Sequence, residues 1–175
     1  MYTWQSHLGT STFDPSYHTN PRVEIMSFLG EPPGTLLDIG CGGGATGVSV
    51  KQKFPGTRVV GIEINPTAAE HARRYLDQVI CAGIDDVDLA RELPGETIST
   101  VLLLDVLEHL YDPWRALQRI RGWLTPGTRV IASVPNIRNL ATLSDIAGGR
   151  CAGLYEWTHE RRGDTAVVVV RPCPG

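Results

Sequence analysis

The sequence of 175 residues has few cysteines, no long hydrophobic run and no excess of positive charge, and each shortage excludes a class of protein. Its four cysteines form no CxxC pair and show no metal-site spacing to histidine, so we expect no disulfide framework. No run reaches the roughly 18–20 apolar residues of a membrane helix. The first residues lack a basic segment followed by an apolar one, so we expect no signal peptide and a cytoplasmic location.

The balance of charges argues against nucleic acid and membrane partners. Sixteen basic and nineteen acidic residues leave a formal net charge of −3, so no global basic field attracts anionic polymers or lipids. The hydrophobic and charged fractions, 42% and 20%, are ordinary for a globular protein. We therefore expect one folded domain whose ligand has to be identified from local motifs.

Strand patterns alternate with helical patterns along most of the chain. The expected strands are residues 35–39, 58–64, 78–82, 97–104 and 128–134, and the expected helices are 21–29, 46–54, 66–77, 113–124 and 139–147. This alternation predicts an α/β fold with a doubly wound, mostly parallel, Rossmann-like sheet. We divide the chain into an N-terminal arm and cap helix (1–34), a Rossmann-like domain (35–147) and an atypical tail (148–175), for which disorder is one alternative.

Two of the expected helices begin with a capping residue followed by proline. Asn65 precedes Pro66 and Asp112 precedes Pro113, and both pairs are typical of a helix N-terminus. His71, beside two arginines, is expected on the solvated face of the first of these helices. The expected core-facing stripe of that helix consists of Ala68, Ala72, Tyr75 and Leu76.

A glycine-rich turn, Asp38-Ile39-Gly40-Cys41-Gly42-Gly43-Gly44, follows the first expected strand. Glycine has no Cβ and tolerates positive φ, so the backbone of such a turn can approach a ligand closely. A nucleoside triphosphate is disfavoured, because a P-loop needs a lysine where this chain has Val48. A dinucleotide stays open, because Gly40, Gly42 and Ala45 formally match its fingerprint.

Acidic residues at the strand ends help to choose between the remaining ligands. Asp38, Glu63, Asp85 and Asp105 end or follow four expected strands, at the edge where parallel sheets bind ligands. Two unit charges about 4 Å apart interact by roughly 4 kcal/mol at an effective dielectric near 20, so Asp38 would oppose a pyrophosphate. The same acid would attract the ammonium and sulfonium of S-adenosylmethionine (SAM). Glu63 suits the ribose of either NAD or SAM.

Several segments, in order, resemble class I SAM-dependent methyltransferases of the small-molecule type. They are residues 36–44 for the first motif, 61–64 for the second-strand acid, 104–110 after the fourth strand and 124–128 before the fifth. The resemblance implies the Rossmann-like sheet of that class. It stops after residues 153–159, so the C-terminal strands are expected to be shortened or missing, with the tail or a second subunit, as in a homodimer, covering the sheet edge.

The resemblance also implies a set of cofactor contacts. Asp38 and the turn backbone would hold the methionine part of SAM, Glu63 the ribose, and Asp105 would lie beside the sulfonium. Gly83 replaces an acid that contacts adenine in the family, so Asp85 or the backbone of Ile84 would serve instead. The full set of implied cofactor-binding residues is Asp38, Gly40, Cys41, Gly42, Glu63, Ile64, Ile84, Asp85, Leu104 and Asp105.

The implied reaction moves the methyl group from sulfur to a nucleophile, leaving S-adenosylhomocysteine. If that nucleophile is a hydroxyl, His109 is the candidate base, with a structural role for this histidine as the alternative. Asp105, Glu108 and His109 also have the spacing of a metal cluster, although we expect no metal. The candidate acceptor contacts are Tyr17, Arg22, His109, Asn136 and Arg138.

We expect a methyltransferase for a small-molecule acceptor, with O-methylation of a sugar or other metabolite favoured. A SAM-binding module without catalysis stays open because of the altered C-terminus. An NAD-dependent oxidoreductase is a weaker alternative, because Asp38 stands where a pyrophosphate would pass.

Overall fold

The computed structural model describes residues 20–135 and 165–170 of the chain. The helix expected at 139–147 lies outside the described residues. Within the described part, none of the helices is long and apolar enough to cross a bilayer.

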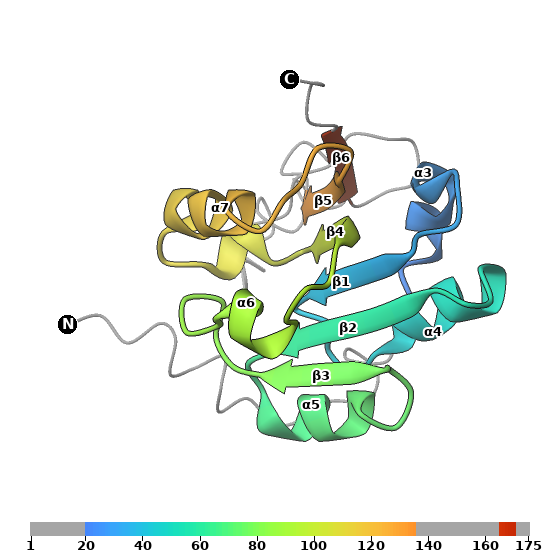
Figure 1. The fold of residues 1–175 in the computed structure, drawn as a ribbon, viewed down its shortest axis with the longest axis horizontal. Helices are drawn as coiled ribbons and strands as arrows, with labels where there is room; N and C mark the ends of the chain where they lie inside the picture. Colours follow the sequence, from blue (N-terminus) through green and yellow to red (C-terminus); the bar gives the residue numbers. More distant parts are fainter. Residues whose placement is uncertain (1–19, 136–164, 171–175) are drawn as a thin grey trace, which may run out of the picture.

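The described strands form one six-stranded sheet with the order β3-β2-β1-β4-β5-β6 (Figure 1). The first five strands are parallel and β6 is antiparallel to β5, which confirms the predicted doubly wound sheet. The chain runs from β1 to β2 and β3 on one side of β1 and then crosses from β3 to β4 on its other side, so the switch point lies between β1 and β4. The strands are β1 (Thr35–Ile39), β2 (Arg58–Glu63), β3 (Gln78–Cys81), β4 (Ile98–Leu104), β5 (Arg129–Pro135) and β6 (Thr165–Val170).

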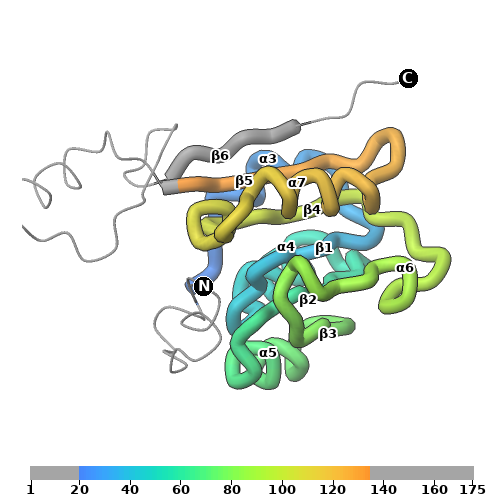
Figure 2. Tube along the Cα trace, turned by 90° about the vertical axis from the view of Figure 1, so that its left-hand side faces the viewer, coloured from blue at the N-terminus to red at the C-terminus, as the bar shows by residue number. Residues whose placement is uncertain are grey.

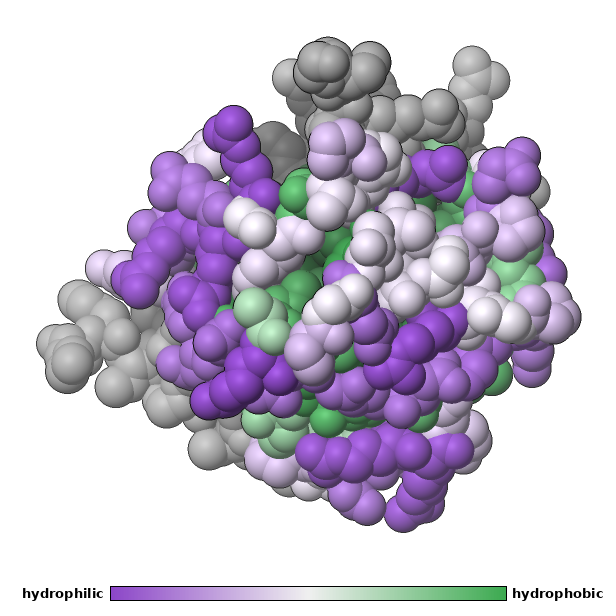
Figure 3. All heavy atoms as spheres, in the orientation of Figure 1, coloured by the Kyte–Doolittle hydropathy of each residue, from purple (hydrophilic) through white to green (hydrophobic). Residues whose placement is uncertain are grey.

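Helices cover both faces of the sheet because successive strand residues point to opposite faces. In β1, Leu36 packs into the cluster under α3 and α4, whereas Leu37 packs into the cluster under α6 and α7. The helical segments are η1 (Val23–Ile25), α3 (Met26–Leu29), α4 (Ala45–Lys53), α5 (Pro66–Ala72), α6 (Leu89–Glu92), η2 (Leu107–His109) and α7 (Pro113–Arg121). Figure 3 shows that on one face of the molecule mostly hydrophilic residues surround a narrow apolar band.

The predicted caps of α5 and α7 are confirmed. The Asn65 side chain accepts hydrogen bonds from the backbone N–H groups of Thr67 and Ala68, and the Asp112 side chain accepts one from Arg115. Proline stands at the start of both helices, where its missing N–H costs nothing.

The predicted end of α5 was wrong. The helix ends at Ala72, because the N–H groups of Tyr75 and Leu76 both bond to the Ala72 carbonyl and the backbone turns there. This turn directs Leu76 into the core and leaves Tyr75 47% exposed, so Tyr75 does not belong to the core stripe, and Ala69 does.

The C-terminal residues supply the strand that covers β5. Residues from Val130↔Val170 to Pro135↔Thr165 pair in antiparallel register, and Figure 1 shows β6 beside β5 at the edge of the sheet. In the turned view of Figure 2, β3, β2, β1, β4 and β5 follow one another across the sheet in that order. Residues 165–170 are therefore a strand, and they cover the β5 edge as the first of the two predicted alternatives, the tail or a second subunit, has it.

Candidate functional site

The predicted acids meet at the carboxyl ends of the central strands. Asp38 in β1 pairs in register with Gly61 of β2 on one side and with Leu102 of β4 on the other. Glu63 ends β2, and both carboxyl groups are buried, with 2% and 8% of each residue exposed. The parallel register thus brings Asp38 and Glu63 together beside the switch point.

The glycine turn needs its glycines for both conformation and space. Gly40, Gly42 and Gly44 have φ values of 73°, 53° and 87°, a region that strains other residues. The N–H of Gly40 donates to the Ile62 carbonyl at 2.8 Å, and a Cβ on Gly40 would lie 2.5 Å from a methyl of Val106. The turn is therefore held tightly between β2 and the segment after β4.

Asp38 is a buried acid with unmet bonding capacity. No residue in the described part donates a hydrogen bond to its Oδ2. Burial, and secondarily the charge of Glu63, raises the pKa of Asp38 to about 7. A buried carboxyl whose oxygen receives no hydrogen bond favours a ligand that brings a hydrogen-bond donor or a positive charge.

Unlike Asp38, Glu63 has a backbone N–H donor for each of its carboxylate oxygens. Its Oε2 accepts from the Gly42 N–H at 2.8 Å and its Oε1 from the Asn65 N–H at 2.8 Å. Each carboxylate oxygen can accept a second bond, so the group can still bind a hydroxyl. Glu63 therefore ties the glycine turn to the start of α5.

Asp105, directly after β4, has an unusual backbone with φ of 55°. Its N–H lies 3.1 Å from both the carbonyl and the hydroxyl oxygen of Ser133, and the Ser133 hydroxyl donates to its Oδ1 at 2.9 Å. Sequence reasoning missed this role of Ser133, although the register of β4 with β5 places Ser133 opposite Leu104. Backbone outliers of this kind concentrate at functional sites.

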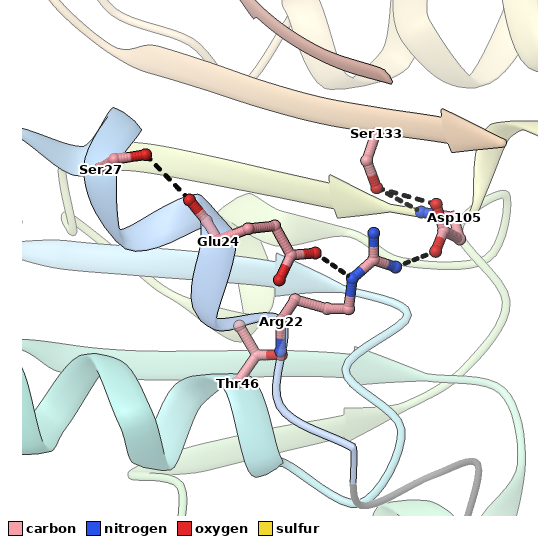
Figure 4. Close-up of polar contacts among 6 residues, drawn as sticks. All are labelled: Arg22, Glu24, Ser27, Thr46, Asp105 and Ser133. Atoms are coloured by element: carbon pink, nitrogen blue, oxygen red, sulfur yellow. Dashed lines mark hydrogen bonds and ion pairs between the residues drawn. The ribbon is translucent and has the colours of Figure 1, made fainter. Parts of the chain in front are cut away.

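Arg22 links the segment after β4 to the segment after β1 by hydrogen bonds (Figure 4). Its guanidinium donates to Oδ2 of Asp105 and to the Glu24 carboxylate, and its backbone N–H donates to the Thr46 hydroxyl at 3.2 Å. Thr46 lies in the first turn of α4, after the glycine turn. The structure thus joins a predicted acceptor contact, Arg22, to a predicted cofactor contact, Asp105.

The other predicted cofactor residues lie at different depths. Ile84 is buried in the core, whereas Ile64 is partly exposed and its methyl lies 3.5 Å from where a Cβ on Gly83 would be. Leu104 packs against the cluster under α3 and α4, on the opposite face of the sheet from Ile84. Asp85 lies 3.8 Å from the guanidinium of Arg115, a partner that sequence reasoning did not include.

Cys41 is placed by packing. Its Sγ would lie 2.5 Å from a Cβ on Gly61, so the side chain fills the space that the β2 glycine leaves. Its contribution to a ligand site would therefore come from the turn backbone.

His109 lies in η2 with its side chain 46% exposed, and its Nε2 is 4.0 Å from Glu108 Oε1. Burial lowers the pKa of His109, which keeps the ring neutral and able to accept a proton near pH 7. In the described part, no three His, Cys, Asp or Glu side chains could hold a metal ion, so Asp105, Glu108 and His109 do not form such a cluster there. Tyr17, Asn136 and Arg138 lie outside the described residues.

His71 was predicted to be solvated, and this prediction was wrong. Its Nδ1 lies 3.0 Å from the Gly43 carbonyl oxygen, and its ring centre is 5.3 Å from that of Tyr75. The contact joins α5 to the glycine turn, which no local pattern of the sequence indicates.

Curated relatives share the sequence over most of the chain. A trans-aconitate 2-methyltransferase of Methylobacterium radiotolerans is 30% identical over 142 residues, 81% of this chain and 52% of that protein. A ubiquinone biosynthesis O-methyltransferase of Pseudomonas paraeruginosa is 31% identical over 144 residues, 79% of this chain and 61% of that protein. The chain thus spans about half to three fifths of the length of these relatives.

Solved structures share the fold. The plantazolicin methyltransferase, solved with S-adenosylhomocysteine, has a TM-score of 0.55 at 18% identity, covering 77% of this chain and 49% of that one. Coclaurine N-methyltransferase has a TM-score of 0.53 at 22% identity, covering 63% and 33%. The family described as Methyltransferase domain matches residues 37–130, which include the glycine turn, Glu63 and Asp105. The chain therefore belongs to the methyltransferase domain family.

Proposed function

We propose that the chain binds SAM where β1, β2 and β4 end and transfers its methyl group to a hydroxyl of a small-molecule acceptor. The observation that carries the cofactor assignment is Asp38, whose buried Oδ2 has no hydrogen-bond partner in the described part. Bound SAM would supply an electrophilic methyl group, and it would also supply the positively charged partner that the Asp38 carboxyl lacks.

The surroundings of Asp38 fit SAM better than a dinucleotide. No lysine or arginine occurs between residues 38 and 50 to compensate a pyrophosphate. Glu63 adds a second buried carboxyl beside Asp38, and its remaining lone pairs can accept from a ribose hydroxyl. The residues present therefore fit a cationic cofactor that also carries a ribose.

The proposed cofactor contacts follow the turn and its neighbours. The backbone of Gly40 to Gly42 would face the methionine part, with Ile64, Ile84 and Asp85 on the adenine side. Leu104 and Asp105 would lie at the sulfonium end. Arg22 bonds to Asp105 and would orient that carboxylate beside the transferred group.

His109 is the proposed base for a hydroxyl acceptor. It follows β4 and is half exposed, and its lowered pKa keeps it neutral near pH 7, as a proton acceptor must be. The name of one relative, an O-methyltransferase of ubiquinone biosynthesis, supports oxygen as the acceptor atom. Arg22, with Tyr17, Asn136 and Arg138, is the proposed acceptor surface. A cytoplasmic location, homodimer formation and the lack of a nucleic acid partner stay predictions.

Binding of SAM without transfer is the second candidate. The chain spans about half to three fifths of its curated relatives, so part of an acceptor site present in them can be absent here. The cyclase SpnF, with a TM-score of 0.51 at 20% identity, shows that the fold also serves another kind of protein.

Calorimetric titration with SAM, S-adenosylhomocysteine, NAD and NADP tests the cofactor. We expect binding of the first two only, and loss of more than about tenfold in affinity for Asp38→Asn, because a charge-assisted contact contributes about 1.5–3 kcal/mol. Glu31→Gln, at an exposed acid before β1 and outside the proposed contacts, is the matched control. Binding of NAD in place of SAM would contradict the proposal.

Incubation with labelled SAM and a panel of hydroxyl, amine and carboxylate acceptors tests the transfer. Labelled product from a hydroxyl acceptor, reduced about a hundredfold or more in His109→Ala, would support His109 as the base. SAM binding with no product from any acceptor would favour the second candidate.

A further inference from the structure

Helix α5 reaches the glycine turn through His71. The Nδ1 atom of His71 lies 3.0 Å from the Gly43 carbonyl oxygen. A carbonyl oxygen can only accept, so Nδ1 carries the hydrogen and donates it. The ring centre also lies 5.3 Å from that of Tyr75, four residues further along the chain and beyond the end of α5.

The same peptide unit is held on its other side. The Gly44 N–H donates to the Cys41 carbonyl at 2.9 Å. Because the Gly43 carbonyl and the Gly44 N–H belong to one planar peptide group, these two hydrogen bonds together set the rotation of that plane. Gly44 has φ of 87°, and because glycine has no side chain, only its hydrogen bonds and neighbours hold this conformation.

Helix α5 is a rigid support for His71. Ala68, Ala69 and Ala72 have no exposed surface, and a Cβ on Gly44 would lie 3.3 Å from the Ala72 Cβ. The capping residue of the helix is Asn65, whose N–H donates to the same Glu63 carboxylate that accepts from the turn. The contacts therefore form a closed ring from the turn through Glu63 and α5 back to the turn.

We propose that His71 is a positioning residue that orients the Gly43–Gly44 peptide of the SAM-binding turn by donating its Nδ1 hydrogen to the Gly43 carbonyl. The inference rests on the proposed function, since it assigns His71 to that same turn. His71 does not touch the cofactor in this scheme and acts through the backbone that does.

Calorimetric titration with S-adenosylhomocysteine tests the proposal on three variants. His71→Ala removes the donor, His71→Asn places an amide N–H near the position of Nδ1, and Arg74→Ala changes an exposed neighbour as the control. We expect about three- to tenfold weaker binding for His71→Ala, the range of one lost hydrogen bond. We expect His71→Asn to recover most of this loss, and Arg74→Ala to match the wild type. Wild-type affinity in His71→Ala, or equal weakness in His71→Asn, would overturn the proposal.

Amide hydrogen exchange in the ligand-free chain gives a readout that does not depend on binding. We expect the Gly44 amide to exchange faster in His71→Ala and to regain protection in His71→Asn, at matched unfolding temperatures. Failure of the wild type to bind S-adenosylhomocysteine would contradict the proposed function, and the exchange data would still decide the role of His71. An unchanged exchange rate of the Gly44 amide in His71→Ala would overturn the proposed positioning role of His71.

Discussion

Two neighbouring acids in this chain have opposite surroundings. Asp38 is buried with an oxygen that receives no hydrogen bond, whereas both oxygens of Glu63 accept backbone N–H groups. A satisfied carboxylate orders the backbone, and an unsatisfied one costs stability that a cationic ligand can recover. Glu63 therefore orders the turn, and under the proposed function it would also bind the ligand, whereas Asp38 would mainly bind the ligand.

Asp38 should make the ligand-free chain less stable as pH rises. Its pKa is raised from 3.8 to about 7 in the folded state, so the folded chain binds the proton more tightly than the unfolded chain. The resulting stability is present below pH 4 and is lost as pH rises toward 7, on the order of 4 kcal/mol at 1.36 kcal/mol per pKa unit. Urea unfolding from pH 5 to 8 should show an advantage of Asp38→Asn over the wild type that widens up to about pH 7 and then levels off. Parallel pH profiles would contradict this expectation.

The backbone of Asp105 offers a second test. Glycine adopts φ of 55° without strain, whereas alanine there costs about 1–2 kcal/mol. We expect Asp105→Gly to be more stable than Asp105→Ala by about 1 kcal/mol, although both lose the bonds to Ser133 and Arg22. Asp105→Asn, which tolerates this φ and keeps an oxygen for Ser133, should exceed both in denaturant unfolding. An alanine variant as stable as the glycine variant would show that the left-handed backbone is absent in solution.

At the scale of elements, β1 and β2 pack together through a matched pair of small groups. The Cys41 side chain occupies the space above Gly61, where a Cβ would lie 2.5 Å from its sulfur and 3.0 Å from Leu76. The close packing allows the glycine turn to fold back over the end of β2. The turn therefore depends on the packing beneath it as well as on its own glycines.

We expect Gly61→Ala to destabilise the fold by about 1–3 kcal/mol through overpacking. The double variant Cys41→Ala with Gly61→Ala should recover part of this loss, because it removes the sulfur that the new methyl would meet. Gly34→Ala, whose Cβ would have its nearest neighbour at 3.9 Å, is the control. Thermal unfolding compares the four proteins, and a double variant no better than Gly61→Ala would contradict the explanation.

For the whole molecule, β6 decides how the sheet ends. Without β6, the backbone of β5 would lack a partner on one side, and unpaired edges promote association between chains. The antiparallel pairing of residues 165–170 prevents this in the described part of the structure.

Removal of residues 165–175 should therefore lower the unfolding temperature and promote aggregation. Removal of residues 171–175 alone keeps all of β6 and serves as the control. Calorimetry and light scattering measure both effects. A long truncation that stays monodisperse with an unchanged unfolding temperature would show that β6 does not support β5.

Much of the site could be predicted because it depends on local chemistry. The strand that carries Asp38, the glycines and the capped start of α5 are each specified by neighbouring residues. The order of strands and helices places the acids at one edge of the sheet. The sequence by itself thus determined the fold class, the glycine turn and the acids that meet there.

Only the tertiary structure decided how these groups are connected. The bonds from Arg22 to Asp105, from Ser133 to Asp105 and from His71 to Gly43 join residues 83, 28 and 28 positions apart. No periodicity or propensity encodes such pairs, because they arise where strands and helices from different segments converge in space. The end of α5 and the place of β6 were decided in the same way, by the packing of Leu76 and by a free strand edge at β5.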